Sequence, residues 1–360
     1  TSLKRIAISK YTDIRHIDKE KSMNGKKILG LAAAGLAFLS LAGFSFGAEP
    51  YTGPKLNLRL ASPSPLGSNM VLGYEKFVEL VKEKSGGKIN IKLMANAVLG
   101  SDRSTLEAAQ RGTLDMASCS SPNMASFARD YMVFDLPYVT SPAYQQQLYD
   151  ALDNGELGKH FEKVANRIGL TTIMFSEYGY RNFAFTSPVT GIGMMEEKKV
   201  RTTDSPIEVA VSRALGMIPS PVAWGEVYTA LQQGTVDGEG NNWEHLVLAK
   251  HIEVLKGAMN SEHNYSMHLL MMNKKKYDAL DPQAQAVLRE AAKEALAYER
   301  NLTKELKEKC EKEMLAQGIV IYRLSAEERA VLKEKTRVVW DTFKNEIDPD
   351  VLQMVLDTQK

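Results

Sequence analysis

The sequence has few cysteines and almost no net charge. Its 360 residues include two cysteines, and 45 basic against 44 acidic residues give a formal net charge of +1. Cys119 lies in a strand-like run and Cys310 in a long helix-like run, so we expect two separate buried thiols rather than a disulfide. A nearly neutral chain without basic clusters interleaved with aromatics has no field that attracts nucleic acid. Nucleic-acid binding is therefore not expected.

Common catalytic and metal-binding motifs are also missing. The histidines form no HExxH motif and no close Cys/His cluster with metal-ligand spacing. The chain has no GxSxG elbow, no Walker loop and no GxGxxG that opens a helix. We therefore expect no metal site, no cofactor and no catalytic residues, and hence a protein that is not an enzyme. The alternative is an exported enzyme that acts on a carboxylate metabolite through dispersed carboxylates.

An export signal is present near the start. Residues 28–48 are almost uncharged, follow Lys26-Lys27 and end in small residues, which is typical of a secretory signal peptide. We expect residues 1–48 to be leader and signal peptide, with residues 1–22 outside the native start, and the exported protein to begin near Glu49. Because the apolar run is also long enough to cross a membrane, an uncleaved anchor on a sensory domain is the alternative.

Strand and helix patterns alternate after residue 55. Residues 55–61, 88–94 and 114–118 are predicted strands, and residues 68–85 and 101–112 are predicted helices. This order favours an α/β fold that begins βαβαβ with parallel pairing. Further strands are expected at 170–175 and 268–272, and a terminal helix at 348–356. The length of the chain favours two domains.

One predicted helix is unusually long. Residues 282–318 are rich in Ala, Leu, Glu, Lys and Gln, with no Pro after the first residue and no Gly before the last. Such a helix extends about 50 Å, which exceeds the width of one small lobe. The heptad pattern of a coiled coil is not sustained along it. We therefore expect this helix to brace two parts of the molecule.

The most specific stretch runs from residue 177 to residue 243. Within it, residues 199–203, 217–222 and 235–238 are predicted strands, and residues 225–233 are a predicted helix. Another helix should start at Ser205-Pro206, with Ser205 as N-cap, Pro206 at the first helical position and Glu208 completing a capping box.

Arg181, Arg201 and Asn241 in this stretch look placed to hold an anion. Arg201, Trp224 and Asn241 lie at or just after the ends of predicted strands, where ligands collect in open α/β sheets. Arginine is suited to this place because its planar guanidinium can hold a carboxylate through two parallel hydrogen bonds. For each arginine, the alternative is an exposed side chain paired with a neighbouring glutamate.

The order of these signals resembles a known family. The motifs that carry the resemblance are Tyr180-Arg181-Asn182-Phe183, Lys199-Val200-Arg201, residues 110–116, residues 221–232 and residues 236–243. They are similar to motifs of the periplasmic substrate-binding proteins of tripartite ATP-independent periplasmic (TRAP) transporters. The resemblance runs from about residue 55 to near the C-terminus.

The resemblance implies a type II-like periplasmic binding protein fold, with two α/β lobes and a ligand cleft between them. Lobe I would comprise residues 55–178 plus 267–306, and lobe II residues 179–266 plus 307–360. The implied function is capture of a small organic carboxylate in the periplasm, by a monomer, for delivery to the membrane subunits of a TRAP permease.

The resemblance also implies roles for individual residues. Arg201 matches the main carboxylate-binding arginine and Arg181 a second cationic contact. The other matched ligand contacts are Trp224, Asn241, Asn242 and Asp204, with Asp102 and Ser120 from the first lobe. Because Asn241-Asn242-Trp243 is similar to the run in relatives that bind sugar acids, a uronate or aldonate is the expected ligand, and a C4-dicarboxylate or another small carboxylate is the alternative.

Overall fold

The computed structural model describes residues 50–360. The expected leader and signal peptide, and the alternative of an uncleaved anchor, lie outside the described residues. Within them, no helix combines the length and the apolar character that crossing a membrane requires. Cys119 and Cys310 are both buried and unpaired, as expected from their surroundings in the sequence.

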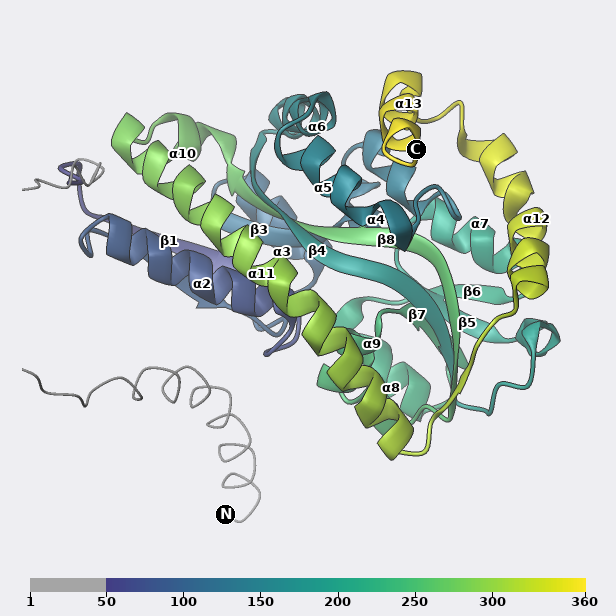
Figure 1. Cartoon of the computed structure of the whole chain (residues 1–360). Helices are drawn as coiled ribbons and strands as arrows, with labels where there is room; N and C mark the ends of the chain where they lie inside the picture. The colour runs from purple at the N-terminus through teal and green to yellow at the C-terminus, as the bar shows by residue number, and fades with distance from the viewer. Residues whose placement is uncertain (1–49) are drawn as a thin grey trace, which may run out of the picture. The chain divides into compact units, whose positions relative to one another are not determined.

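One mixed nine-stranded sheet runs through this part of the chain, in the order β2-β1-β3-β8-β4-β7-β5-β6, with β9 paired to β8 (Figure 1). Its strands are β1 (Leu56–Ala61), β2 (Ile89–Met94), β3 (Met116–Ser120), β4 (Leu170–Phe185), β5 (Lys199–Thr202), β6 (Ile218–Pro221), β7 (Gly238–Asn241), β8 (Gly257–Asn273) and β9 (Val320–Tyr322). β1 pairs in parallel with both β2 and β3, so the predicted βαβαβ start is confirmed. β5 likewise pairs in parallel with β6 and β7.

Helices flank the sheet. They are α2 (Asn69–Lys84), α3 (Asp102–Gln110), α4 (Ser121–Met124), α5 (Gln145–Asp153), α6 (Glu156–Arg167), α7 (Pro206–Ala214), α8 (Val227–Gln232), α9 (Trp243–Leu248), α10 (Lys274–Asp278), α11 (Pro282–Ala316), α12 (Ala326–Phe343) and α13 (Pro349–Asp357). Short 3-10 turns include η3 (Arg129–Asp135), η4 (Pro142–Tyr144), η5 (Ile192–Met195), η6 (Trp224–Glu226) and η7 (His251–Glu253).

β4 and β8 connect the two groups of parallel strands. They form one long antiparallel ladder, from Leu170 opposite Asn273 to Phe185 opposite Gly257. The C-terminal part of β8 also pairs with β3, and the C-terminal part of β4 also pairs with β7. The expected lobe boundaries, between residues 178 and 179 and between residues 266 and 267, lie opposite each other in this ladder. A register shift falls there, between Glu177 and Gly179, and Gly179 has φ +102°, a conformation that glycine adopts without strain.

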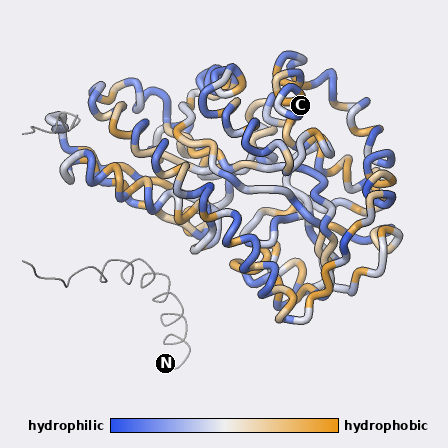
Figure 2. The backbone as a smooth tube through the Cα atoms, viewed as in Figure 1, coloured by the Kyte–Doolittle hydropathy of each residue, from blue (hydrophilic) through white to orange (hydrophobic). Residues whose placement is uncertain are grey.

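The predicted bracing helix is confirmed. α11 has 35 residues, which corresponds to about 52 Å at 1.5 Å per residue. Its first half packs against α2 in the apolar cluster around Phe77, and its second half contributes Cys310 and Met314 to a different cluster with α9. Figure 2 shows polar and apolar residues alternating along α11, as expected for a helix with one buried face.

Two local predictions need correction, and one helix was missed. β7 begins at Gly238, so the strand predicted at 235–238 lies too early; Gly-Glu-Gly has little strand propensity of its own, and pairing between β4 and β5 imposes the conformation. Ser205 caps α7 as predicted, but the Glu208 carboxylate accepts from the N–H and hydroxyl of Thr203 rather than from Ser205, so the predicted capping box is wrong. α12 was not predicted, although its sequence carries a real capping box.

Candidate ligand-binding site

The ends of several strands meet around one small, partly open cavity. Its lining residues are Pro63, Ser64, Asp102, Ser120, Asn123, Tyr178, Arg181, Arg201, Thr203, Trp224, His245 and His268. Five of the eight residues predicted for the site are therefore brought together here: Arg201, Arg181, Trp224, Asp102 and Ser120. The sheet register explains part of this meeting, because Arg201 lies beside Glu239 on β7 and Asn182 lies opposite Asn241.

Arg201 is a buried cation with few protein partners. Only 4% of the residue is exposed, and its Nε donates to the carbonyl of Val222 at 2.9 Å. Among residues 50–360, neither terminal guanidinium nitrogen has a hydrogen bond or an ion-pair partner. Burial lowers the pKa of Arg201; the carboxylate of Glu239 acts against this shift, and the nearby Arg181 acts with it. An anion in the cavity would supply the missing charge and acceptors.

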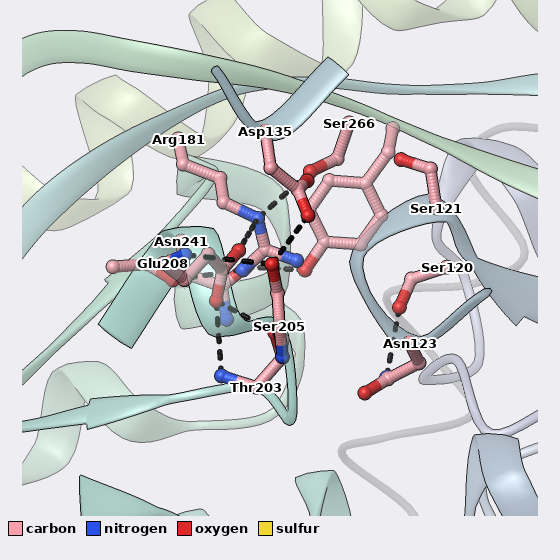
Figure 3. Close-up of polar contacts among 12 residues, drawn as sticks. Ser120, Ser121, Asn123, Asp135, Arg181, Thr203, Ser205, Glu208, Asn241 and Ser266 are labelled. Carbon is pink, nitrogen blue, oxygen red and sulfur yellow. Dashed lines mark hydrogen bonds and ion pairs between the residues drawn. The ribbon is translucent and has the colours of Figure 1, made fainter. Parts of the chain in front are cut away.

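Arg181 is held much more firmly by the protein. Its Nε donates to Ser266 Oγ at 2.8 Å and lies 3.2 Å from Glu208 Oε1, and its Nη1 donates to the carbonyl of Gly240 at 2.9 Å (Figure 3). Although burial acts to lower the pKa of Arg181, nearby acidic groups, Glu208 first, outweigh it and raise the pKa. The guanidinium carbon also lies 4.9 Å from the ring centre of Tyr178. The Nε and Nη1 donors of Arg181 therefore already have protein partners, which hold the side chain in place.

A second carboxyl group completes this buried network. Asp135 Oδ2 accepts from Ser205 Oγ at 2.6 Å (Figure 3). Burial and the neighbouring Glu208 raise the pKa of Asp135 well above its ordinary value, whereas the charge of Arg181 and the donors of Thr203 hold the pKa of Glu208 below its own, against the effect of burial. The network therefore favours a charged carboxylate on Glu208 beside Arg181. Neither Asp135 nor Glu208 was predicted from sequence as a residue of the site.

Asn241 and Asn242 lie behind the cavity rather than in its wall. Asn241 Oδ1 accepts from the hydroxyl of Tyr178, and its Nδ2 donates to Glu239 at 2.9 Å. Asn242 caps α9, with its Oδ1 accepting from the backbone N–H of His245 at 2.8 Å. Both amides therefore orient residues that line the cavity.

Asp102 and Ser120 also line the cavity. Asp102 begins α3, and its Oδ1 accepts from the backbone N–H of Ser120 at 2.9 Å. Ser120 Oγ in turn accepts from Asn123 Nδ2 at 2.9 Å, a contact separate from the arginine network in Figure 3. Asp204 is exposed and lines an adjoining groove together with Asp102, Arg201 and Trp224.

Sequence reasoning missed three ring-bearing residues that line the cavity, Tyr178, His245 and His268. The ring of Tyr178 lies 4.4 Å from that of His245, tilted by 30°, and it stacks on His268 at 5.8 Å. Trp224 lies 5.4 Å from His245. Pairing of the β3–β8 ladder sets His268 opposite Ser120, which is a tertiary register that no local motif encodes.

Two other polar regions in the described part of the chain have side chains that already pair with one another or with the backbone. Asp130, His160 and Asp348 bring potential metal-ligating atoms within 4.8 Å of one another, but His160 and Arg167 already pair with Asp130. A larger, open groove lies between α6 and α11. Its Arg289 donates to the carbonyl of Thr172, and its Arg300 pairs with Asp153.

Comparisons with known proteins identify the family of this chain. The family model described as bacterial extracellular solute-binding protein, family 7, matches residues 61–346. The C4-dicarboxylate-binding periplasmic protein DctP of Rhodobacter capsulatus is 32% identical over 339 residues, which cover 92% of this chain and 97% of that protein.

Two crystal structures of TRAP periplasmic solute-binding proteins are also similar. The protein from Ochrobactrum anthropi, whose C-terminus is bound in its ligand-binding pocket, is 32% identical with a TM-score of 0.74, covering 85% of this chain and 95% of that one. The protein from Xanthobacter autotrophicus, with bound β-D-galacturonate, is 26% identical with a TM-score of 0.78, covering 84% and 99%. The chain therefore belongs to family 7 of the bacterial extracellular solute-binding proteins, the binding proteins of TRAP transporters.

Proposed function

We propose that this chain captures a small organic carboxylate in the periplasm and delivers it to the membrane subunits of a TRAP permease, acting as a monomeric binding protein and not as an enzyme. The observation that carries the proposal is Arg201: a buried guanidinium lines the cavity, and both of its terminal nitrogens lack partners among residues 50–360. A buried charge of this kind is costly unless a ligand compensates it. A carboxylate supplies both the charge and two acceptors in the right plane.

The preferred ligand is a sugar acid, either a uronate or an aldonate. The galacturonate bound to the Xanthobacter relative favours this class, as do the polar and aromatic groups that surround the arginines. The C4-dicarboxylate named for the Rhodobacter relative is the alternative ligand. Both classes share the carboxylate that Arg201 would hold, with Arg181 as second cation and Trp224 beside it.

The proposed lobes are residues 55–178 plus 267–306, and residues 179–266 plus 307–360. Asp102, Ser120 and His268 then belong to lobe I, whereas Arg181, Arg201 and Trp224 belong to lobe II. Because the cavity is lined from both sides, ligand contacts would stabilise a closed arrangement in proportion to their differential affinity for that state. Asn241, Asn242 and Asp204 would support the second-lobe wall.

A ligand screen tests the proposal. Purified protein would be heated with a panel of organic acids that includes galacturonate, gluconate and succinate, because a ligand at about a thousandfold excess over its Kd stabilises the native state by about 4 kcal/mol. We expect at least one acid to raise Tm, to bind in calorimetric titration and to be recovered chemically unchanged. No shift with any acid, or turnover of the bound acid, would contradict the proposed function.

A further inference from the structure

We propose that Asp102 and His245 form an acceptor pair that selects ligands carrying hydroxyl groups and excludes ligands carrying a second carboxylate. The inference rests on the proposed function, since it assumes a carboxylate at the arginines. It extends that function by choosing between polyhydroxy acids and dicarboxylates from the chemistry of the acceptors that line the same cavity.

The ring of His245 presents an acceptor to the cavity. Its Nδ1 lies 2.9 Å from Asn242 Oδ1, which also accepts the backbone N–H of His245 at 2.8 Å. Because the Asn242 amide nitrogen donates to the carbonyl of Tyr178, Oδ1 is fixed as an acceptor and Nδ1 of His245 must carry the ring proton. Burial lowers the pKa of His245 well below its ordinary value. The ring is therefore neutral, and Nε2 holds a lone pair.

That lone pair has no protein partner. His245 is 2% exposed, and its Nε2 is buried without a hydrogen bond among the described residues. The ring is held by its hydrogen bond to Asn242 and by packing against Tyr178, 4.4 Å away between ring centres. A buried acceptor left unpaired costs free energy, and a hydroxyl of a ligand in the cavity would satisfy it.

Asp102 adds a carboxylate to the same cavity. It is 6% exposed, and one oxygen is held by the backbone N–H of Ser120. The nearest basic side chain is His268, whose Nε2 lies 3.8 Å from Asp102 Oδ1. Burial lowers the pKa of His268 to about 4, so at neutral pH the imidazole carries no charge. No lysine or arginine lies within ion-pair distance of Asp102 among residues 50–360.

The cavity is therefore lined by donors and by acceptors, which require different ligand groups. Arg181 and Arg201 supply donors and positive charge, whereas Asp102 and His245 can only accept. A hydroxyl can donate to either acceptor, and Ser64, whose buried Oγ also has no partner among the described residues, can pair with the same group. A second carboxylate has no proton to donate and would meet the negative charge of Asp102 at close range.

The test compares three acids on wild type and two variants. In Asp102→Asn the amide oxygen can still accept from Ser120, while the negative charge is lost; in His245→Phe the ring can still pack against Tyr178, while the acceptor is lost. Calorimetric titration with galacturonate, gluconate and succinate gives the affinity ratio of hydroxy acid to dicarboxylate. We expect wild type to prefer galacturonate or gluconate.

Asp102→Asn should lower that ratio by about 10- to 100-fold, with succinate binding more tightly than to wild type. His245→Phe should weaken the hydroxy acids by about tenfold and leave succinate unweakened. The control variant Asp130→Asn removes a carboxylate that does not line the cavity and should leave the ratio unchanged. A merely structural role for Asp102 would weaken all three acids together.

The outcomes separate the inference from the function on which it rests. If wild type prefers succinate, or if Asp102→Asn leaves the ratio unchanged, the acceptor pair is disproved while carboxylate binding stands. If none of the acids binds wild type, both proposals fail.

Discussion

Arg181 and Glu208 form a buried ion pair, with the arginine Nε 3.2 Å from the glutamate Oε1. Arg201 lines the same cavity, but it has no carboxylate within ion-pair distance in the part of the chain that the structure describes. Two arginines only twenty residues apart in sequence therefore differ in what compensates their charge. The protein itself compensates the charge of Arg181, whereas Arg201 is available to a ligand. Substitution of Arg181 should therefore mainly lower stability, and substitution of Arg201 should mainly lower ligand affinity.

Arg201 should give the larger loss of affinity. Arg201→Ala would leave the ligand carboxylate desolvated and short of a partner, which costs about 2–5 kcal/mol by analogy with buried interface pairs. Arg201→Lys should fail too, because lysine keeps the charge but lacks the planar fork. Calorimetric titration with the acid that binds wild type measures both losses. Arg213→Ala, on the exposed side of α7, is the control; wild-type affinity in Arg201→Ala with the fold intact would remove Arg201 from the site.

Arg181 should give the larger loss of stability. Arg181→Met leaves Glu208 as a buried carboxylate without its cation, a change that costs about 3–5 kcal/mol. Arg201→Met breaks no ion pair and should change stability little, or increase it, because an uncompensated buried charge is removed. Urea unfolding of the two variants without ligand compares them directly. Equal destabilisation by both would mean that Arg201 has a protein partner in solution.

The sequence predicted the residues whose role is local. Arg201 lies in a short motif at the end of β5, and Ser205 caps its helix from a recognisable signal. The same is true of α11, because 35 residues without an internal break permit only a long helix. Such features depend on neighbours within a few residues.

The residues that were missed depend on tertiary pairing. His268 reaches the cavity because β8 pairs with both β3 and β4, and Tyr178 because β4 shifts register between Glu177 and Gly179. Much of β4 was not predicted as strand, since polar residues such as Arg181 and Asn182 interrupt its apolar pattern. Buried polar strands of this kind can be assigned only when their partners are known.

Ligand binding should make the molecule more compact. Because the proposed contacts come from both lobes, the acid that binds wild type should decrease the radius of gyration in small-angle scattering. Arg201→Ala at the same concentration of acid should keep the ligand-free profile, which separates closure from a general solvent effect. An unchanged profile at saturating ligand in wild type would contradict closure.

Stability should fall between about pH 4.5 and pH 7 because of Glu244. This residue on α9 is buried, and burial raises the pKa of its carboxyl group from 4.5 to about 7, although Lys307 acts against the shift. In that window the unfolded state releases the proton while the folded state keeps it, so the free energy of unfolding decreases as pH rises. The full penalty above pH 7 is about 3 kcal/mol, from about 1.4 kcal/mol for each unit of pKa difference between the folded and unfolded states.

Glu244→Gln should therefore stabilise the protein at pH 8 and have little effect at pH 4, as measured by urea unfolding. Glu305→Gln on the exposed side of α11 is the matched control. An equal effect of Glu244→Gln at both pH values would show that the carboxyl group does not ionise differently in the two states.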